Sequence, residues 1–194
     1  MASSYSSDLS LELITTGEKA GLWGTITNTN LQILQQAASG YVAVPMTSLT
    51  DVTLSLADGS DTANGKNLYL KLTGTMTASI SLIIPAATTG GTATRTYIIE
   101  DTTDRTTANN YTINIKTAGS STPVPLPEGA NIIVRSDGTD TVLAFIKPGI
   151  KNITAATITA YTAVNGDQVV VDTQANAVTI TLPITPNVTD EVTI

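Results

Sequence analysis

The sequence predicts a mainly β fold, in which an amino-terminal strand, loop and short helix precede β-sandwich or barrel-like modules. Three observations favour this class. Threonine is the commonest residue, and its β-branched side chain suits a pleated, half-buried surface. Apolar and polar residues alternate along much of the chain, and clusters of Gly, Asn and Asp separate the alternating stretches. Charged residues make up only 13% of the 194 residues, which argues against a coiled coil and against charge-driven disorder.

Leucines alternate with polar residues near the amino terminus. Leu9, Leu11 and Leu13 occupy every second position, which predicts a short strand with one apolar face. Residues 16–25 follow, with three glycines around Trp23, and this composition indicates a structured loop. Because those glycines would let a partner's backbone approach closely, we interpret Trp23 as a packing or docking anchor in preference to a sugar-binding ring.

Residues 31–39, LQILQQAAS, carry the only convincing helical pattern. Asn28 and Asn30 can cap the amino end of this helix, and Gly40 is typical of the position just past a carboxyl end. A helix of about three turns is too short to be stable alone. We therefore expect it to pack on its own β-domain, on a sister copy or on another protein. Its apolar stripe consists of Leu31, Leu34 and Ala38.

From residue 41 onward the pattern is β almost throughout. Pro85 ends one alternating stretch, as a proline does at the end of a strand. The turn SDGTD at 136–140 separates two apolar runs and predicts a hairpin, and Asn165-Gly166 separates another such pair. Strands at this spacing favour a sandwich or a barrel. The clearest alternating stretches are 52–56, 68–72, 80–84 and 111–115.

The sequence also contains an internal repeat. Residues 67–85 and 168–183 each consist of an alternating strand, a small polar turn, a second alternating strand and a proline. The segment KPGIKN at 147–152 has the Pro and Gly typical of a domain boundary. Because the second copy stops within a strand, we expect the chain to be the front of a longer polypeptide. The predicted organisation is an attachment segment at 1–40, a β-domain at 41–148 and the start of a second β-module at 149–194.

The composition excludes several classes of function. The chain has no cysteine and no histidine, which removes disulfides, Cys/His zinc sites and His-dependent catalysis. A net charge of −7 with nine scattered basic residues argues against nucleic-acid binding. The start lacks the basic and apolar regions of a signal peptide, and no run is apolar enough to span a membrane. We predict no metal, no cofactor and no enzymatic activity.

Two kinds of acidic cluster are candidate sites of chemistry. Glu100, Asp101 and Asp104 lie close together, and glycoside hydrolases use paired carboxylates. Because Glu100 and Asp101 fall on opposite faces of a strand, and no aromatic sugar platform is evident nearby, we interpret these acids as solvated turn residues. The loops at 58–65 and 136–140 contain Asp-Gly pairs without the ligand spacing of a calcium loop, so Asx turns explain them.

The stretch 16–41 has the pattern Gly-x-Trp-Gly-x-x-Thr-Asn-x-Asn-Leu, then a short helix and Ser-Gly-Tyr. It resembles the amino-terminal region of tail-fibre-like virion structural proteins of marine and cyanobacterial tailed bacteriophages. Residues 161–183 are similar to a repeated module of such fibres. The resemblance implies a protein of the virion tail appendage, assembled in the host cytoplasm. It also implies parallel homotrimers, an amino terminus that binds a tail, baseplate or adaptor protein, and a distal region, not present in this chain, that contacts the host receptor.

The sequence therefore predicts an anchor that attaches a tail fibre to the virion and extends it towards the host. The alternatives are a capsid decoration protein, a tail adaptor, the non-catalytic front of a polysaccharide-degrading tailspike, and a bacterial surface adhesin, against which the missing signal peptide counts. The residues predicted to make docking or oligomer contacts are Leu9, Leu11, Leu13, Trp23, Leu31, Leu34 and Ala38.

Overall fold

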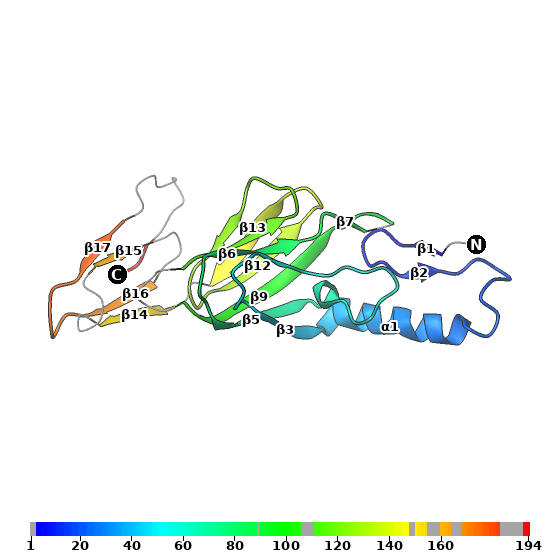
Figure 1. Ribbon diagram of the computed structural model, residues 1–194, viewed down its shortest axis with the longest axis horizontal. Coiled ribbons are helices and arrows are strands. Elements are labelled where there is room, and N and C mark those ends of the chain that lie inside the picture. The colour runs from blue at the N-terminus through cyan, green and yellow to red at the C-terminus, as the bar shows by residue number, and fades with distance from the viewer. Residues whose placement is uncertain are drawn as a thin grey trace.

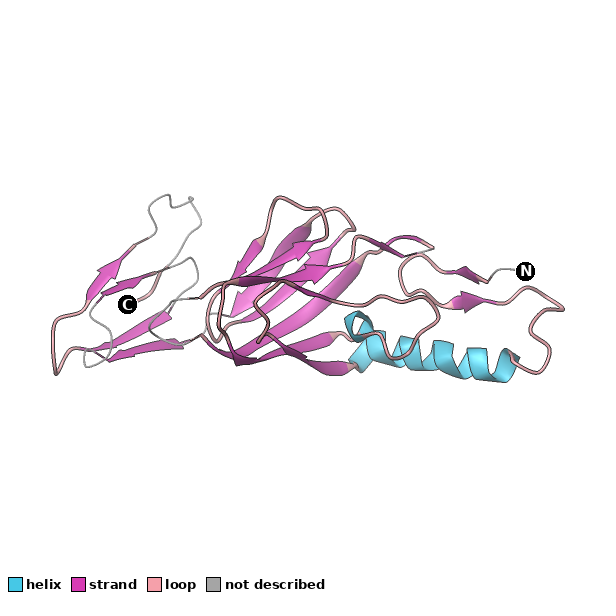
Figure 2. Cartoon of the chain, viewed as in Figure 1, coloured by secondary structure: helices cyan, strands magenta, loops and turns pink. Residues whose placement is uncertain are grey.

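A computed structural model describes residues 3–88, 90–105, 111–147, 150–154, 160–163, 168–182 and 192–194. The molecule is elongated, and its amino and carboxyl termini lie towards opposite ends (Figure 1). Strands dominate the part that is described, with one α-helix at the amino-terminal end (Figure 2). The predicted mainly β class is confirmed. The described strands form several mixed sheets and no closed barrel, and the one helix described is not long and apolar enough to cross a membrane.

The helix α1, Trp23–Ser39, begins eight residues before the predicted start. The prediction of a loop was therefore wrong for its last three residues, 23–25. Neither Asn28 nor Asn30 caps the helix, because the amino-terminal cap is Leu22, which makes no side-chain capping bond. The first helical residues have weak intrinsic helix propensity, which is why the sequence did not indicate a helix there.

Gly40 does follow the helix, as predicted, but its backbone is extended, with φ of −67°, and not left-handed. A Cβ atom there would lie 2.5 Å from Oδ1 of Asn67 and 2.6 Å from the backbone of Gln36. Close approach of neighbouring atoms, and not a special dihedral angle, is thus what requires glycine at this position.

The predicted strand at 9–13 is mostly absent. Only β2, Glu12–Leu13, is a strand, and it pairs antiparallel with β1, Ser4–Tyr5. Ser10 interrupts the pattern, because it is fully buried and has a positive φ of 56°. A residue in the left-handed region ends an extended strand, so the alternation of leucines misled the prediction here.

Two sheets of the β-domain face each other across one apolar core. Leu72 and Ile99 reach it from the larger sheet, and Leu82 and Ile115 from the smaller sheet, all fully buried. The larger sheet, in spatial order, holds β13 Thr141–Lys147, β12 Asn131–Ser136, β9 Arg95–Asp104, β5 Tyr69–Thr75 and β3 Tyr41–Pro45. The smaller sheet holds β11 Val124–Leu126, β10 Ile113–Thr117, β6 Ile80–Ile84 and β4 Val52–Thr53. Two short elements lie outside these sheets: the 3-10 helix η1, Asn64–Lys66, and the β7–β8 pair, Ala87–Thr88 and Gly91–Thr92.

Six strands of the two sheets alternate between them in chain order: β3, β4, β5, β6, β9 and β10. β3, β5 and β9 belong to the larger sheet, whereas β4, β6 and β10 belong to the smaller one. Within each sheet these neighbours run parallel. A parallel neighbour needs a crossover connection, and here the intervening strand of the other sheet supplies it.

The hairpin predicted at 136–140 is confirmed, since β12 and β13 pair antiparallel across it. The side chain of Asp137 accepts hydrogen bonds from the backbone N–H groups of Thr139 and Asp140, both at 2.9 Å. Gly138 supplies the positive φ of 87° that the turn needs. An Asx turn therefore explains this acidic loop, as predicted.

The second module repeats the strand pairing of the first. β14 pairs parallel with β16 and β15 with β17, just as β3 pairs with β5 and β4 with β6. Thr193 makes a parallel bridge to Gln168 at the start of β16. This bridge corresponds to the parallel pairing of β9 with β5 in the first module. The bounds are β14 Ile150–Thr154, β15 Ala160–Thr162, β16 Gln168–Asp172 and β17 Thr179–Thr181. The repeat in sequence is therefore also a repeat in topology.

Two predictions touch residues outside those that are described. The turn at Asn165-Gly166 lies outside them, and so do residues 148–149 of the boundary segment 147–152. The strands beside the turn, β15 and β16, belong to different two-stranded sheets. The prediction that they form a hairpin was wrong, because β15 pairs with β17 and β16 pairs with β14.

Candidate docking surface

The β1–β2 hairpin is attached to one face of α1 by polar contacts. Asn30 of the helix accepts a hydrogen bond from the backbone N–H of Glu12 at 3.0 Å and donates one to its carbonyl at 2.9 Å. The carboxylate of Glu12 accepts a hydrogen bond from Ser3 at 2.7 Å and pairs with Lys19 at 2.9 Å. The hydrogen bonds from Ser3 and Lys19 lower the pKa of Glu12. The asparagine predicted as a helix cap is thus a tether between the helix and the hairpin.

Only part of the apolar surface of α1 is covered by the rest of the chain. Ile33 is fully buried, and Ile26 and Ala37 on the same face are partly covered. The adjacent row of the helix is exposed, with Trp23 64%, Leu31 58% and Leu34 41% accessible. We call this row the helix stripe; it consists of Trp23, Thr27, Leu31, Leu34 and Ala38, spaced four, four, three and four residues apart.

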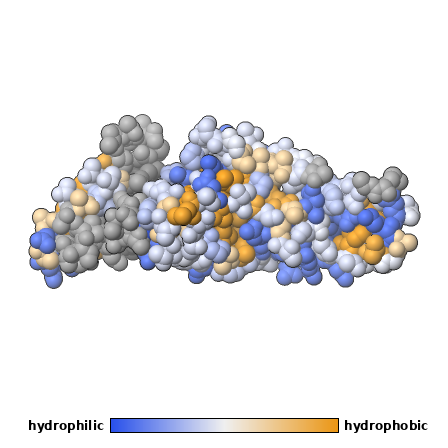
Figure 3. Space-filling view, in the orientation of Figure 1, coloured by the Kyte–Doolittle hydropathy of each residue, from blue (hydrophilic) through white to orange (hydrophobic). Residues whose placement is uncertain are grey.

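The helix stripe lies beside further apolar surface at the amino-terminal end of the molecule. Leu22 is 56% exposed, Leu13 51% and Ile14 37%. Figure 3 shows hydrophobic surface over the end that α1 and β2 form. Exposed apolar surface of this kind is typical of interaction sites.

The structure divides the seven predicted contact residues into two groups. Leu9 and Leu11 are partly buried within the chain, and Leu9 lines a small pocket beside Lys66. The remaining five form one exposed set around α1 and β2: Leu13, Trp23, Leu31, Leu34 and Ala38.

The outer face of the larger sheet carries a second apolar row, which the sequence analysis missed. The row crosses all five strands in direct register: Tyr41, Tyr69, Ile98, Ile133 and Phe145. We call it the sheet ladder. The rings of Tyr41 and Tyr69 stack with centroids 5.6 Å apart. Tyr41 and Phe145 at the two edges are 57% and 58% exposed. Only the strand register brings these five residues into one row, and the sequence alone does not supply that register.

A shallow groove of about 360 Å³ lies along the ladder. The side chains of Tyr69, Glu100 and Phe145 line it, and the Tyr69 hydroxyl donates a hydrogen bond of 2.9 Å to the Glu100 carboxylate. Aromatic rings therefore lie near one of the acids, contrary to the sequence analysis. Burial and the bond to Glu100 raise the pKa of Tyr69.

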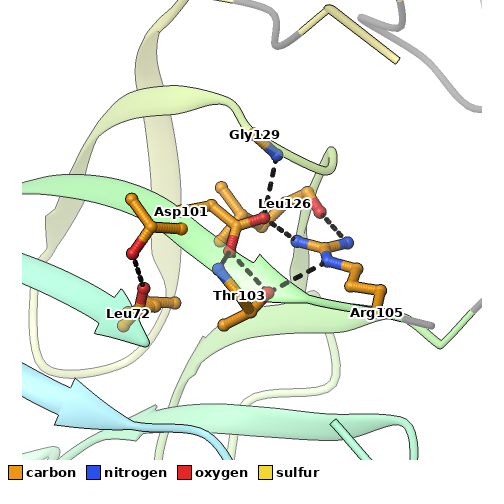
Figure 4. Close-up of polar contacts among 7 residues, drawn as sticks. Leu72, Asp101, Thr103, Arg105, Leu126 and Gly129 are labelled. Atoms are coloured by element: carbon orange, nitrogen blue, oxygen red, sulfur yellow. Dashed lines mark hydrogen bonds and ion pairs between the residues drawn. The ribbon is translucent and has the colours of Figure 1, made fainter. Parts of the chain in front are cut away.

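The acidic cluster does not form a facing pair of carboxylates at Glu100 and Asp101. Burial alternates along β9, so Asp101 points into the protein and Glu100 to the outer face. Asp101 is buried and accepts hydrogen bonds from both the backbone and the hydroxyl of Thr103 and from the backbone N–H of Gly129 (Figure 4). It also binds Arg105 at 2.5 Å. The role of Asp101 is therefore to fix the interior, and the prediction of solvated acids was wrong for this residue.

Within the part of the chain that is described, no three His, Cys, Asp or Glu side chains gather as a metal site would require. No family model, curated protein or solved structure matches this chain.

Proposed function

We propose that the chain is a structural component of a bacteriophage tail fibre, which anchors the fibre to the virion tail and extends it towards the host. The observation that carries this proposal is the uncovered helix stripe at one end of an elongated molecule. A stripe with Trp23 and Leu31 more than half exposed is suited to a protein partner that buries it.

The architecture supports a load-bearing role. Two copies of one pairing pattern follow each other along the chain, so the molecule can lengthen by adding modules. The attachment segment and the second module lie at opposite ends in Figure 1. This arrangement supports an amino-terminal attachment to a tail, baseplate or adaptor protein and distal growth towards the receptor.

We also propose that three copies assemble in parallel about the fibre axis. A single chain leaves two apolar rows uncovered, the helix stripe and the sheet ladder. Closed rotational symmetry would bury such rows without producing endless filaments. The tail partner then contacts the part of the amino-terminal surface that sister copies leave open.

The experiment that tests the anchoring role places charged residues in the helix stripe and measures how much of the protein is incorporated into virions. Leu31→Asp with Leu34→Asp should reduce incorporation into particles at least tenfold, because two carboxylates would be buried without partners. The matched control is Gln32→Asp with Gln35→Asp, which adds the same charge to exposed polar positions of the same helix. The control should incorporate as the unaltered chain does.

Electron microscopy of the same particles locates the chain. Density at the tail would support the proposal, and density on the capsid would replace it with a decoration protein. Normal incorporation of the doubly charged helix would show that attachment uses another surface.

A further inference from the structure

A pocket of about 170 Å³ lies between the amino-terminal segment, the end of α1 and the start of β9. It is distinct from the helix stripe and from the sheet ladder. Two cationic side chains line it, Lys66 from η1 and Arg95 from β9, and its lining includes no Asp or Glu. The remaining lining residues are Leu9, Ala37, Asn67, Leu68, Thr94, Thr96 and Tyr97.

Lys66 has no hydrogen-bond partner for its charged end. The side chain is fully buried, and Nζ meets no acceptor. The hydroxyl of Tyr97, which also lines the pocket, donates a hydrogen bond of 2.8 Å to the carbonyl of Gly65. A buried ammonium without an acceptor is costly, and proteins rarely keep one without a use.

Arg95 is in a similar state. It is 7% exposed, and Nη2 donates to the carbonyl of Asp8 at 2.8 Å. Its Nε is buried and has no acceptor. Two cationic side chains that line one pocket therefore each keep a hydrogen-bond donor without an acceptor.

Both charged side chains that line the pocket are cationic, and three carboxylates, of Asp8, Asp58 and Asp61, attract them from outside the lining. Burial, together with repulsion from Arg95, lowers the pKa of Lys66 to about 8. Asp58 and Asp61 attract Lys66 and oppose this shift, but neither lines the pocket. Burial lowers the pKa of Arg95 as well, and Tyr97 and Asp8 oppose this shift. At neutral pH both side chains are cationic, and they repel each other.

We propose that this pocket binds a small oxyanion, of the phosphate class, between Nζ of Lys66 and Nε of Arg95. An oxyanion offers several acceptor oxygens to the two unused donors and removes the repulsion between the cations. The volume is several times that occupied by one water molecule, about 30 Å³, so an anion of five heavy atoms fits. The bound anion would join the amino-terminal segment, η1 and β9, and so stiffen the base of the attachment segment.

The probe is inorganic phosphate, added to the full chain at pH 7 and compared with chloride at equal ionic strength. Phosphate should raise the midpoint of thermal unfolding by a few degrees in a saturable manner. Lys66→Met removes one charge without a large change in volume and should weaken phosphate binding at least tenfold. Lys71→Met is the matched control, because Lys71 is a partly exposed lysine on the outer face of the sheet.

A second measurement does not depend on how the variants fold. The pKa of the Lys66 amine, followed by NMR in the unaltered chain, should rise when phosphate is added, because a bound anion favours the charged form. The proposal is overturned if phosphate stabilises no more than chloride does, if Lys66→Met keeps the full phosphate effect, or if the Lys66 amine does not respond. A phosphate effect lost in Lys66→Met and kept in Lys71→Met would establish the site.

Discussion

Asp101 and Arg105 form an ion pair of 2.5 Å in the interior of the β-domain, four residues apart at the end of β9. Both side chains are almost fully buried. Arg105 also donates a hydrogen bond of 2.8 Å to the carbonyl of Leu126 in β11, which lies in the opposite sheet. The pair therefore ties the two sheets together and leaves no member free for surface chemistry.

Breaking this pair should be costly. Asp101→Asn leaves the Arg105 guanidinium buried without a counter-charge, and we expect a loss of about 3–5 kcal/mol in the free energy of unfolding. Chemical denaturation measures it. The control is Glu100→Gln on the outer face, which should change the free energy of unfolding by about 0.5 kcal/mol or less. Equal effects of the two substitutions would contradict the structural role of the pair.

The chain should be inactive towards polysaccharides. Glu100 and Asp101 point to opposite faces of one strand, so they do not present the facing carboxylates that glycoside hydrolysis needs. Incubation with capsular or lipopolysaccharide glycans should release no new reducing ends. Release that disappears in Glu100→Gln would reverse this prediction, and this variant is preferred because it leaves the buried pair intact.

Stability should increase with pH through the titration of Lys66. The pKa of Lys66 is about 8 in the folded chain, whereas in the unfolded chain it takes the ordinary value of 10.5. Between these two pH values the unfolded chain therefore binds more protons than the folded chain. The free energy of unfolding should therefore rise from pH 8 to about 10.5, by at most about 3 kcal/mol. Other groups titrate in this range, so the measurement is the difference from Lys66→Met, which should lack this contribution. Parallel curves for the two proteins would contradict it.

The residues that the sequence placed correctly are those whose environment is local. The alternation at 80–84 coincides with β6, and the Asp-Gly turn at 136–140 closes a hairpin. Both signals depend on neighbours within a few residues. Alternation also identifies the buried side of a strand, which is why the mainly β class could be predicted.

Features that depend on distant residues could not be predicted in the same way. Alternation does not say which strand is a neighbour, so the parallel pairing of alternate strands within each sheet and the sheet ladder were missed. Lys66 lies in a polar stretch with glycine, which is typical of an exposed loop, yet it is fully buried. The local sequence predicts Asn30 as a helix cap, yet its partner Glu12 lies 18 positions away along the chain.

The oligomeric state provides the last prediction. We expect a homotrimer of about 60 kDa, three times the 20.1 kDa chain, by mass photometry or sedimentation. Leu34→Asp should weaken the trimer if sister helices bury the stripe, because Leu34 is 41% exposed in the single chain and a carboxylate there would lose its solvent. Phe145→Asp tests the sheet ladder in the same way, and Gln35→Asp is the control on α1.

The two rows can be separated by the pattern of results. A trimer that persists in Leu34→Asp and dissociates in Phe145→Asp would assign the sister contact to the sheet ladder and leave the helix stripe for the tail protein. The reverse pattern would assign the stripe to the sister copies. Two-fold or single copies in the particle would contradict the trimer itself. Because buried apolar contacts depend little on ionic strength, added salt should not dissociate the trimer, whereas an assembly held by surface ion pairs would weaken.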